Sequence, residues 1–203
     1  ESIRALWGNR SVFIAASTHE GEEELILDAA RKIRGQFRDL LLIIVPRHPE
    51  RFDRVTALCR RSGLNTLRRS DGKPCSSQVQ ALVVDSMGEL SVFYGTADVA
   101  FVGGSLVNHG GHNILEPAAL SRPVITGPHY FNFLEITRQF LEHHAAIEVK
   151  NTEQLADSVI ALLKDPQRRA EMGDAGKHLI EQSKGASQRF LILIDVHISH
   201  VQR

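Results

Sequence analysis

The sequence predicts a doubly wound α/β fold, in which a Rossmann-like parallel sheet carries helices on both faces. Short apolar segments rich in β-branched residues alternate with longer segments whose apolar residues recur at helical spacing. The run from Asp39 to Pro46 is apolar almost throughout, which is typical of a strand buried on both faces of a parallel sheet. Strands and helices that alternate in this way form βαβ crossovers.

The first half of the chain predicts three strand and helix pairs. The strands are expected at 11–17, 39–46 and 80–86, and the helices at 21–37, 49–63 and 88–95. Pro49 suits the first turn of the second helix, and Gly63 suits its end.

The second half continues the alternation. Strands are expected at 98–104, 122–127 and 145–150, and helices at 115–121, 132–144 and 152–165. After Pro166 the pattern is helical only, and residues 189–200 are apolar enough to need a partner surface. No repeat or linker interrupts the chain, so we expect one domain over residues 1–203.

Composition excludes several function classes. Lys and Arg together number 24, as do Asp and Glu, so no net field favours nucleic acid or an anionic membrane. Cys59 and Cys75 are too few for a disulfide framework, which fits a reduced cytosolic setting. No apolar run is long enough to span a bilayer, so we expect this fragment to be soluble. The chain begins at Glu1 rather than Met, which suggests a piece of a longer protein.

Ligands of open parallel sheets bind at the carboxyl ends of the strands, so the loops there are the candidate site. The loop Ser17–Glu23 offers a hydroxyl pair, an imidazole and a glycine. One interpretation is helix capping alone, by Ser17 or Thr18. Capping leaves His19 and Gly21 unexplained, so a ligand-binding role is the alternative.

Two further loops follow buried strands. In the first, Arg47 and His48 precede a helix that starts at Pro49, an arrangement that suits an anion clamp; a solvated arginine in a turn is the alternative. In the second, Gly88 would let the backbone approach a flat base closely. Met87 beside it is the alternative, since a Met at a helix start more often fills a core than stacks on a base.

The stretch FVGGSLVNHGGHNILEPAAL, residues 101–120, is the richest candidate. Pro117 lacks an N–H group and is tolerated only in a first turn, so a helix must begin near Asn113 to Leu115. Glycines at its mouth would let main-chain amides face a phosphate. The stretch matches neither the dinucleotide-binding glycine pattern nor the P-loop.

Glu116 lies in the first turn of the same helix and has two interpretations. It can complete a capping box with Asn113, or it can accept hydrogen bonds from a ribose diol. His109, His112 and His129 also fall in strand-end loops, but their spacing fits no metal-ligand motif. We therefore expect no metal.

Six blocks in this order and spacing resemble the C-terminal half of the bacterial 3-deoxy-D-manno-octulosonic acid (Kdo) transferases, over residues 11–186. They are STHEGEE, PRHPERF, MGEL, YGTADVAFVGGSL, GGHNILEPAA and GPHYFNF. The resemblance implies the C-terminal half of a GT-B glycosyltransferase, a fold in which two Rossmann-like domains face each other across a cleft. It also implies transfer of Kdo from CMP-Kdo to a lipid A precursor, with inversion and without a metal or cofactor, at the cytoplasmic face of the inner membrane.

By the same resemblance, this chain is the CMP-Kdo binding domain alone. The implied donor-binding residues are Ser17, Thr18, His19, Arg47, His48, Met87, Gly88, Glu89, Gly103, Gly104, Gly111, His112, Asn113 and Glu116. The catalytic base, the lipid A precursor site and any membrane contact would belong to the N-terminal half, which is absent here. The fragment alone is then expected to be inactive, with residues 189–200 left without their partner domain.

Two other readings stay open on the sequence. One is a different GT-B nucleotide-sugar enzyme, such as a UDP-sugar transferase or a sugar epimerase. The other is a non-catalytic α/β interaction module whose loops are merely capped turns.

Overall fold

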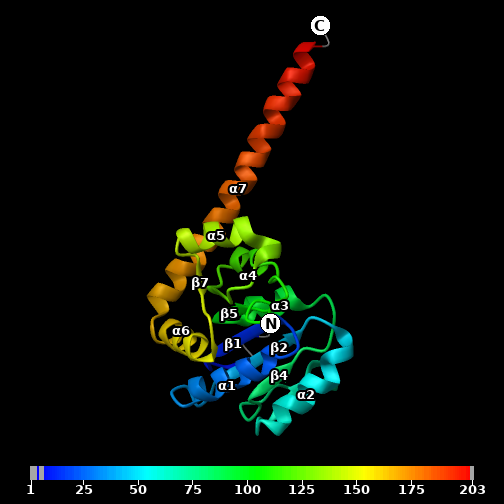
Figure 1. Cartoon of the computed structure of the whole chain (residues 1–203), viewed down its shortest axis with the longest axis vertical. Coiled ribbons are helices and arrows are strands. Elements are labelled where there is room, and N and C mark those ends of the chain that lie inside the picture. Colours follow the sequence, from blue (N-terminus) through cyan, green and yellow to red (C-terminus); the bar gives the residue numbers. More distant parts are fainter. Residues whose placement is uncertain (1–3, 5–6, 202–203) are drawn as a thin grey trace.

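The computed structural model describes residue 4 and residues 7–201, with side chains described as far as residue 183. Its centre is a seven-stranded sheet of order β3-β4-β2-β1-β5-β6-β7, in which every neighbouring pair is parallel. The strands are β1 Val12–Thr18, β2 Leu41–Pro46, β3 Thr66–Arg68, β4 Ala81–Val83, β5 Val99–Val102, β6 Val124–Thr126 and β7 Ala146–Glu148. The predicted parallel α/β fold is confirmed (Figure 1).

The strand order reverses at β1, which lies between β2 and β5. Phe13 is level with Leu42 on one side and with Val99 on the other. The chain moves outward from β1 to β2 and β4 in one direction, and to β5, β6 and β7 in the other. The carboxyl ends of β1 and β5 therefore mark the point of strand-order reversal, which is where open α/β sheets bind their ligands.

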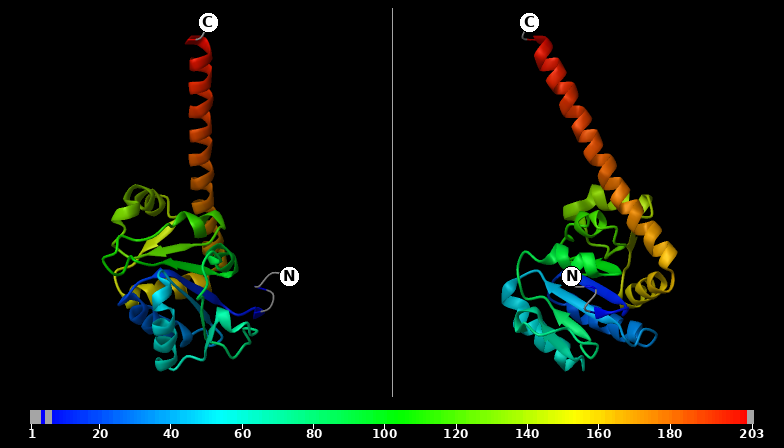
Figure 2. Two further views of the ribbon diagram at one scale, coloured as in Figure 1. Left: turned by 90° about the vertical axis from the view of Figure 1, so that its right-hand side faces the viewer. Right: turned by 180° about the vertical axis from the view of Figure 1, so that it is seen from behind.

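Helices cover both faces of the sheet (Figures 1 and 2). Their bounds are α1 Glu22–Arg34, α2 Phe52–Arg61, α3 Leu90–Thr96, α4 Leu115–Ala119, α5 Leu134–Glu142, α6 Thr152–Lys164 and α7 Pro166–Val201. α1, α2 and α6 pack over one face, on a core that includes Phe13, Leu42 and Phe101. α3, α4 and α5 pack over the other face. Alternate residues of each buried strand thus enter opposite cores.

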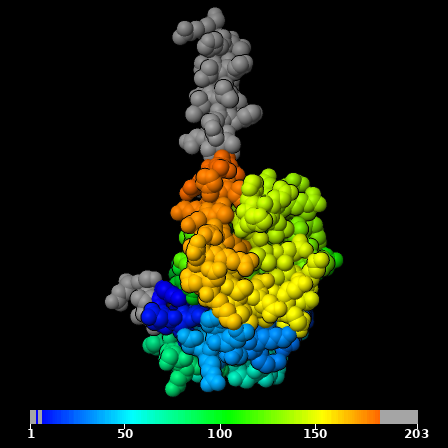
Figure 3. All heavy atoms as spheres, turned by 90° about the vertical axis from the view of Figure 1, so that its left-hand side faces the viewer, coloured from blue at the N-terminus to red at the C-terminus, as the bar shows by residue number. Residues whose placement is uncertain are grey.

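On the face shown in Figure 3, α6 lies between α1 and the first part of α7, and Lys32 of α1 pairs with Glu153 of α6 at 2.6 Å. α7 then passes the loop that precedes β6, and Gly173 approaches the Ser121 carbonyl so closely that a Cβ would lie 2.1 Å from it. The prediction of helix alone after Pro166 is confirmed by α7. The expected apolar face at 189–200 concerns side chains outside the described ones.

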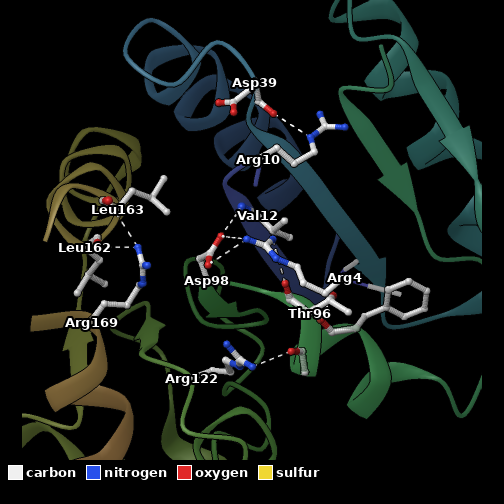
Figure 4. Close-up of polar contacts among 12 residues, drawn as sticks. Arg4, Arg10, Val12, Asp39, Thr96, Asp98, Arg122, Leu162, Leu163 and Arg169 are labelled. Atoms are coloured by element: carbon white, nitrogen blue, oxygen red, sulfur yellow. Dashed lines mark hydrogen bonds and ion pairs between the residues drawn. The ribbon is translucent and has the colours of Figure 1, made fainter. Parts of the chain in front are cut away.

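Side chains close the amino-terminal edge of the sheet (Figure 4). The Arg10 guanidinium donates to the carbonyls of Asp39, Leu40, Ser76 and Val79. Asp98 accepts from the Val12 amide at 2.8 Å and pairs with Arg4. The polar groups at this edge are largely engaged with the protein's own backbone, so the opposite edge is where ligand chemistry should be sought.

Local expectations were wrong in three places. β3 was not predicted, because its sequence Thr-Leu-Arg has no apolar run; it is an edge strand with half-buried side chains. Neither Ser17 nor Thr18 caps α1, whose N-cap is Gly21 in the left-handed conformation, with φ of 82°. The predicted helix at 49–63 divides into a 3₁₀ turn, Pro49–Arg51, and α2.

Candidate functional site

A cluster of four histidines marks the carboxyl ends of β1, β2 and β5. The His19 ring, which is 8% exposed, stacks on His109 with centroids 4.2 Å apart and meets the edge of His48 at 5.4 Å. The Nε2 atoms of His19 and His112 lie 2.7 Å apart, a hydrogen-bond distance. Three loops far apart in the sequence therefore converge on one group of imidazoles at the strand-order reversal.

The environment keeps two of these imidazoles uncharged. Burial, together with the smaller effect of the neighbouring His109, His112 and His48 rings, lowers the pKa of His19 to about 4. Burial also lowers the pKa of His112 to about 4, with Arg47 as the largest charged contributor. At neutral pH the pair holds a hydrogen bond without a net charge.

The histidine pair should make stability depend on pH. Unfolded histidines titrate near pH 6.5, whereas these two have a pKa of about 4 when folded. Between these values the unfolded chain binds more protons, so stability should fall as the pH drops from about 6.5 to about 4. Denaturant unfolding at a series of pH values measures this. His112→Gln should reduce this loss of stability, whereas His178→Gln, which replaces an exposed histidine, should not. Equal pH profiles for the unaltered chain and both variants would contradict the prediction.

Glu22 opens α1 but turns its carboxylate inward, and its side chain is fully buried. One oxygen accepts from the amides of His19 at 3.3 Å and Gly104 at 2.8 Å. The other accepts from Ser105 at 3.1 Å and Leu106 at 2.9 Å. Burial raises the pKa of Glu22, while these amides act in the opposite direction. The carboxylate thus ties the loop after β1 to the loop after β5.

Glu23 is also fully buried, and its carboxylate connects the start of α1 to the loop that follows β2. Its two oxygens accept from the Arg51 guanidinium at 2.7 and 3.0 Å, a bidentate pair. Thr18 donates its hydroxyl to the same carboxylate at 2.9 Å. Because Arg51 belongs to the turn that follows His48, this ion pair fixes the second strand-end loop against the first.

Arg47 supplies an exposed positive charge at the rim of the cluster. Its amide donates to the Thr18 carbonyl at 3.1 Å, which fixes its backbone beside β1. Its guanidinium has no acidic partner among the described residues, in contrast to the paired Arg51. A cation of this kind beside a 3₁₀ turn that starts at Pro49 can hold an anion.

Asn113 and Glu116 lie together at the start of α4. Asn113 Oδ1 accepts from the Leu115 amide at 3.1 Å, and its Nδ2 group donates to Glu116 Oε1 at 3.3 Å. The prediction that this helix begins near residues 113–115 is confirmed. The capping box is not formed in its usual way, because Ile114 is the N-cap and Glu116 accepts from a side chain.

Three glycine amides expected to face a phosphate have acceptors within the protein instead. Gly103 donates to the Ala16 carbonyl, Gly104 to Glu22 and Gly111 to the Gly104 carbonyl. The glycines serve the turn itself: Gly104, Gly110 and Gly111 all have positive φ. Ligand binding by Gly103, Gly104 and Gly111 stays a prediction. For the amides of Asn113 and Ile114 no acceptor is found in the described part of the chain.

The Met87–Glu89 turn makes its polar contacts away from the histidine cluster, with Arg69 and Ser86. Met87 is 64% exposed, so it is not core filling. Gly88 has φ of 84°, and Glu89 pairs with Arg69 at 3.0 Å and bonds to Ser86. No hydrogen bond or ring contact joins this turn to the imidazole cluster among the described residues. Its place in a ligand site stays a prediction.

Sequence reasoning missed Glu22, Glu23, Arg51 and His109 as parts of this arrangement. Acidic residues in the first turn of a helix favour the helix dipole, and that role alone accounts for the two glutamates in the sequence. The signal that could have found them is the position of Glu22 and Glu23 one turn before Ile26 and Leu27, on the buried side of the amphipathic pattern.

Neither a metal site nor a membrane span is found among the described residues. No group of three or more His, Cys, Asp or Glu residues there could hold a metal ion. Within the same residues, no helix combines the length and the hydrophobicity needed to cross a bilayer.

Comparison with known proteins agrees with this geometry. The family of glycosyl transferases group 1 matches residues 8–179. The 3-deoxy-D-manno-octulosonic acid transferase of Haemophilus influenzae is 46% identical over 98% of this chain and 47% of that protein. The transferase of Bordetella pertussis is 36% identical over 90% of this chain and 44% of that protein. The chain spans about half the length of these relatives.

Solved structures agree as well. The C-terminal CMP-Kdo binding domain of WaaA from Acinetobacter baumannii superposes with a TM-score of 0.82 at 40% identity, over 86% of this chain and 91% of that one. The C-terminal domain of LpcC from Francisella tularensis shares the fold alone, with a TM-score of 0.62 at 15% identity over 90% and 92% of the two chains. The GT-B fold and the resemblance drawn from the six sequence blocks are confirmed. The chain belongs to the glycosyl transferases group 1 family, and within it to the 3-deoxy-D-manno-octulosonic acid transferases, whose C-terminal domain it matches.

Proposed function

We propose that residues 1–203 form the domain of a Kdo transferase that binds the sugar donor CMP-Kdo. One observation carries the proposal. The chain is 40% identical to the C-terminal CMP-Kdo binding domain of WaaA and covers 91% of that domain's length. The geometry supports it, because the histidine cluster, the start of α4 and Arg47 lie together at the strand-order reversal. Arg47 has no acidic partner in the described part of the chain. That is the position where open α/β sheets bind nucleotides.

Each part of the site has a proposed role. Arg47 and His48, with the amides of Asn113 and Ile114, hold the phosphate of the donor. Glu116, oriented by Asn113, accepts the ribose hydroxyls. Ser17 and His19 face the sugar carboxylate, while Thr18, which is fully buried with its hydroxyl bonded to Glu23, holds the loop in place. The Met87–Glu89 turn flanks the cytosine. The Gly103, Gly104 and Gly111 backbone gives the loop its shape, and His112 completes the phosphate side.

The whole enzyme would transfer Kdo from CMP-Kdo to a lipid A precursor, lipid IVA, with inversion and without a metal. An inverting transfer needs a base on the acceptor hydroxyl and stabilisation of the leaving phosphate. We assign the second task to this chain. The base, the acceptor site and the membrane contact, at the cytoplasmic face of the inner membrane, are assigned to the half of the relatives that this chain does not span. This chain alone should bind the donor without turning it over.

Calorimetric titration with CMP tests the proposal. We expect saturable binding of CMP and weaker binding of UMP and UDP. Arg47→Ala should weaken CMP binding by about 1.5–3 kcal/mol, or roughly tenfold to more than a hundredfold, because a charge-assisted phosphate contact is lost. Glu116→Gln should weaken CMP binding while binding of inorganic phosphate is kept. Arg38→Ala, which removes an exposed charge that follows α1, is the matched control.

Other outcomes identify the alternatives. Preference for UDP over CMP would favour a UDP-sugar transferase or a sugar epimerase. Failure of every nucleotide to bind, with the Arg47 and Glu116 variants unchanged, would favour an interaction module. Detection of Kdo transfer by this chain alone would contradict the assignment of the base to another half.

A further inference from the structure

The amides of Gly104, Ser105 and Leu106 form an anion-binding nest that the protein fills itself. Three successive N–H groups converge on one carboxylate at distances of 2.8–3.1 Å. Concave groups of backbone amides like this one bind phosphates in other proteins. Here the anion is Glu22, whose side chain is fully buried. A ligand phosphate must therefore bind beside this nest and not in it.

The backbone packs closely around the Glu22 carboxylate. A Cβ on Gly103 would lie 2.7 Å from Glu22 Oε2 and 2.7 Å from the Ser17 carbonyl, so only glycine fits there. The His19 amide adds a fourth donor from the other side. The buried charge is thus satisfied by main-chain donors alone, which a neutral side chain of similar size cannot reproduce.

The nest also sets the position of the candidate phosphate site. Gly104 lies against both imidazoles of the pair, since a Cβ there would be 3.0 Å from His112 Cδ2 and 3.3 Å from His19 Cδ2. Its carbonyl accepts from the Gly111 amide at 2.9 Å, so the two ends of the loop 104–111 are joined. His112 and Asn113 follow directly. A shift of the nest would move the histidine pair and the start of α4 with it.

We propose that Glu22 is a positioning residue of the donor site: its carboxylate acts as an internal anion that closes the amide nest and holds the loop bearing His112 and Asn113 in its binding geometry. The role in donor binding depends on the proposed function. The closure of the nest does not depend on it, and the two can be tested apart.

The first test replaces Glu22 by alanine in this chain and titrates CMP. We expect the affinity to fall about tenfold or more, because several hydrogen bonds to a charged group are lost and the loop is released. Glu22→Ala removes Cγ and the carboxylate group, and acetate consists of one such carbon and one carboxylate. Affinity should therefore recover as acetate replaces chloride at constant ionic strength. Glu24→Ala is the matched control, since Glu24 is exposed in the same helical turn.

The second test follows hydrogen exchange of the Gly104, Ser105 and Leu106 amides by NMR, without nucleotide. These amides should exchange faster in Glu22→Ala and slow again when acetate is added, with no such change in Glu24→Ala. Should Glu22→Ala not fold, Glu22→Gln serves instead. Its amide nitrogen cannot accept, so exchange should quicken and CMP affinity fall, and acetate should have no effect because the space is filled.

The outcomes separate the two proposals. If the unaltered chain does not bind CMP, the proposed function fails, while amide exchange still reports on the nest. If the unaltered chain binds CMP and the Glu22 variants bind it equally well, the positioning role is overturned. A folded Glu22→Ala protein in which acetate acts no differently from chloride would also overturn it.

Discussion

Replacing Glu23 by alanine is expected to lower the free energy of unfolding by about 3–5 kcal/mol. Glu23 is fully buried and its partner Arg51 is only 14% exposed. Removing the carboxylate leaves the guanidinium without its bidentate acceptor and the Thr18 hydroxyl without its partner. An uncompensated charge in a buried position costs far more than the pair contributes in net terms. Denaturant unfolding followed by circular dichroism measures the change.

A second ion pair between the same two segments gives the control. Glu20 pairs with Arg54, and both side chains are more than half exposed. Glu20→Ala should cost at most about 1 kcal/mol, since surface pairs are screened by water and salt. The double variant Glu23→Met, Arg51→Met should recover part of the loss, because apolar side chains remove the buried charge altogether. Equal losses for Glu20→Ala and Glu23→Ala would contradict this account.

Gly127→Ala should be similarly severe, with a loss of about 3 kcal/mol or more through overpacking. A Cβ at residue 127 would lie 2.2 Å from the carbonyl carbon and oxygen of Ser105 and 2.4 Å from the Leu106 amide. Backbone cannot give way as a flexible side chain does. The segment at 105–106 would have to move, with loss of the bond from the Gly127 amide to Ser105 Oγ at 2.8 Å. Thermal and denaturant unfolding measure the effect.

Gly95→Ala is the matched comparison for that substitution. Gly95 lies in α3, and a Cβ there would meet nothing within 4 Å. Alanine in a helix is favoured over glycine by about 0.5–1 kcal/mol, so this variant should be neutral or slightly more stable. Were Gly127→Ala as stable as Gly95→Ala, the close approach of Gly127 to the backbone of Ser105 and Leu106 would be refuted.

The sequence could predict the sheet because its central strands are buried on both sides. Continuous apolar runs such as Leu41–Pro46 have few other uses in a chain of this composition. The same reasoning placed the candidate site, since the ends of such strands meet at one edge. β3 escaped prediction for the converse reason: a short edge strand is specified by its neighbour β4 and not by its own residues.

The polar interior of the site could not be predicted from local pattern. Glu22 and Glu23 occupy first-turn positions where acidic residues are common on exposed surfaces. What buries them is the approach of two distant segments, at Arg51 and at Gly104–Leu106. The glycines pose the same difficulty, because the sequence does not distinguish a glycine required by a turn from one required for ligand binding. Only the long-range contact assigns the amides of Gly104 and Gly111 to protein acceptors.

The short contact between His19 and His112 has a further chemical consequence. When both rings are neutral, only one of the two facing nitrogens carries hydrogen. The ring that donates then has a bare Nδ1, and the ring that accepts has a protonated Nδ1. Two residues of the same type therefore hold opposite tautomers and differ in polarity, one a donor and the other an acceptor at its remaining nitrogen. A ligand bound beside the pair would therefore meet an N–H donor on one imidazole and a bare nitrogen acceptor on the other.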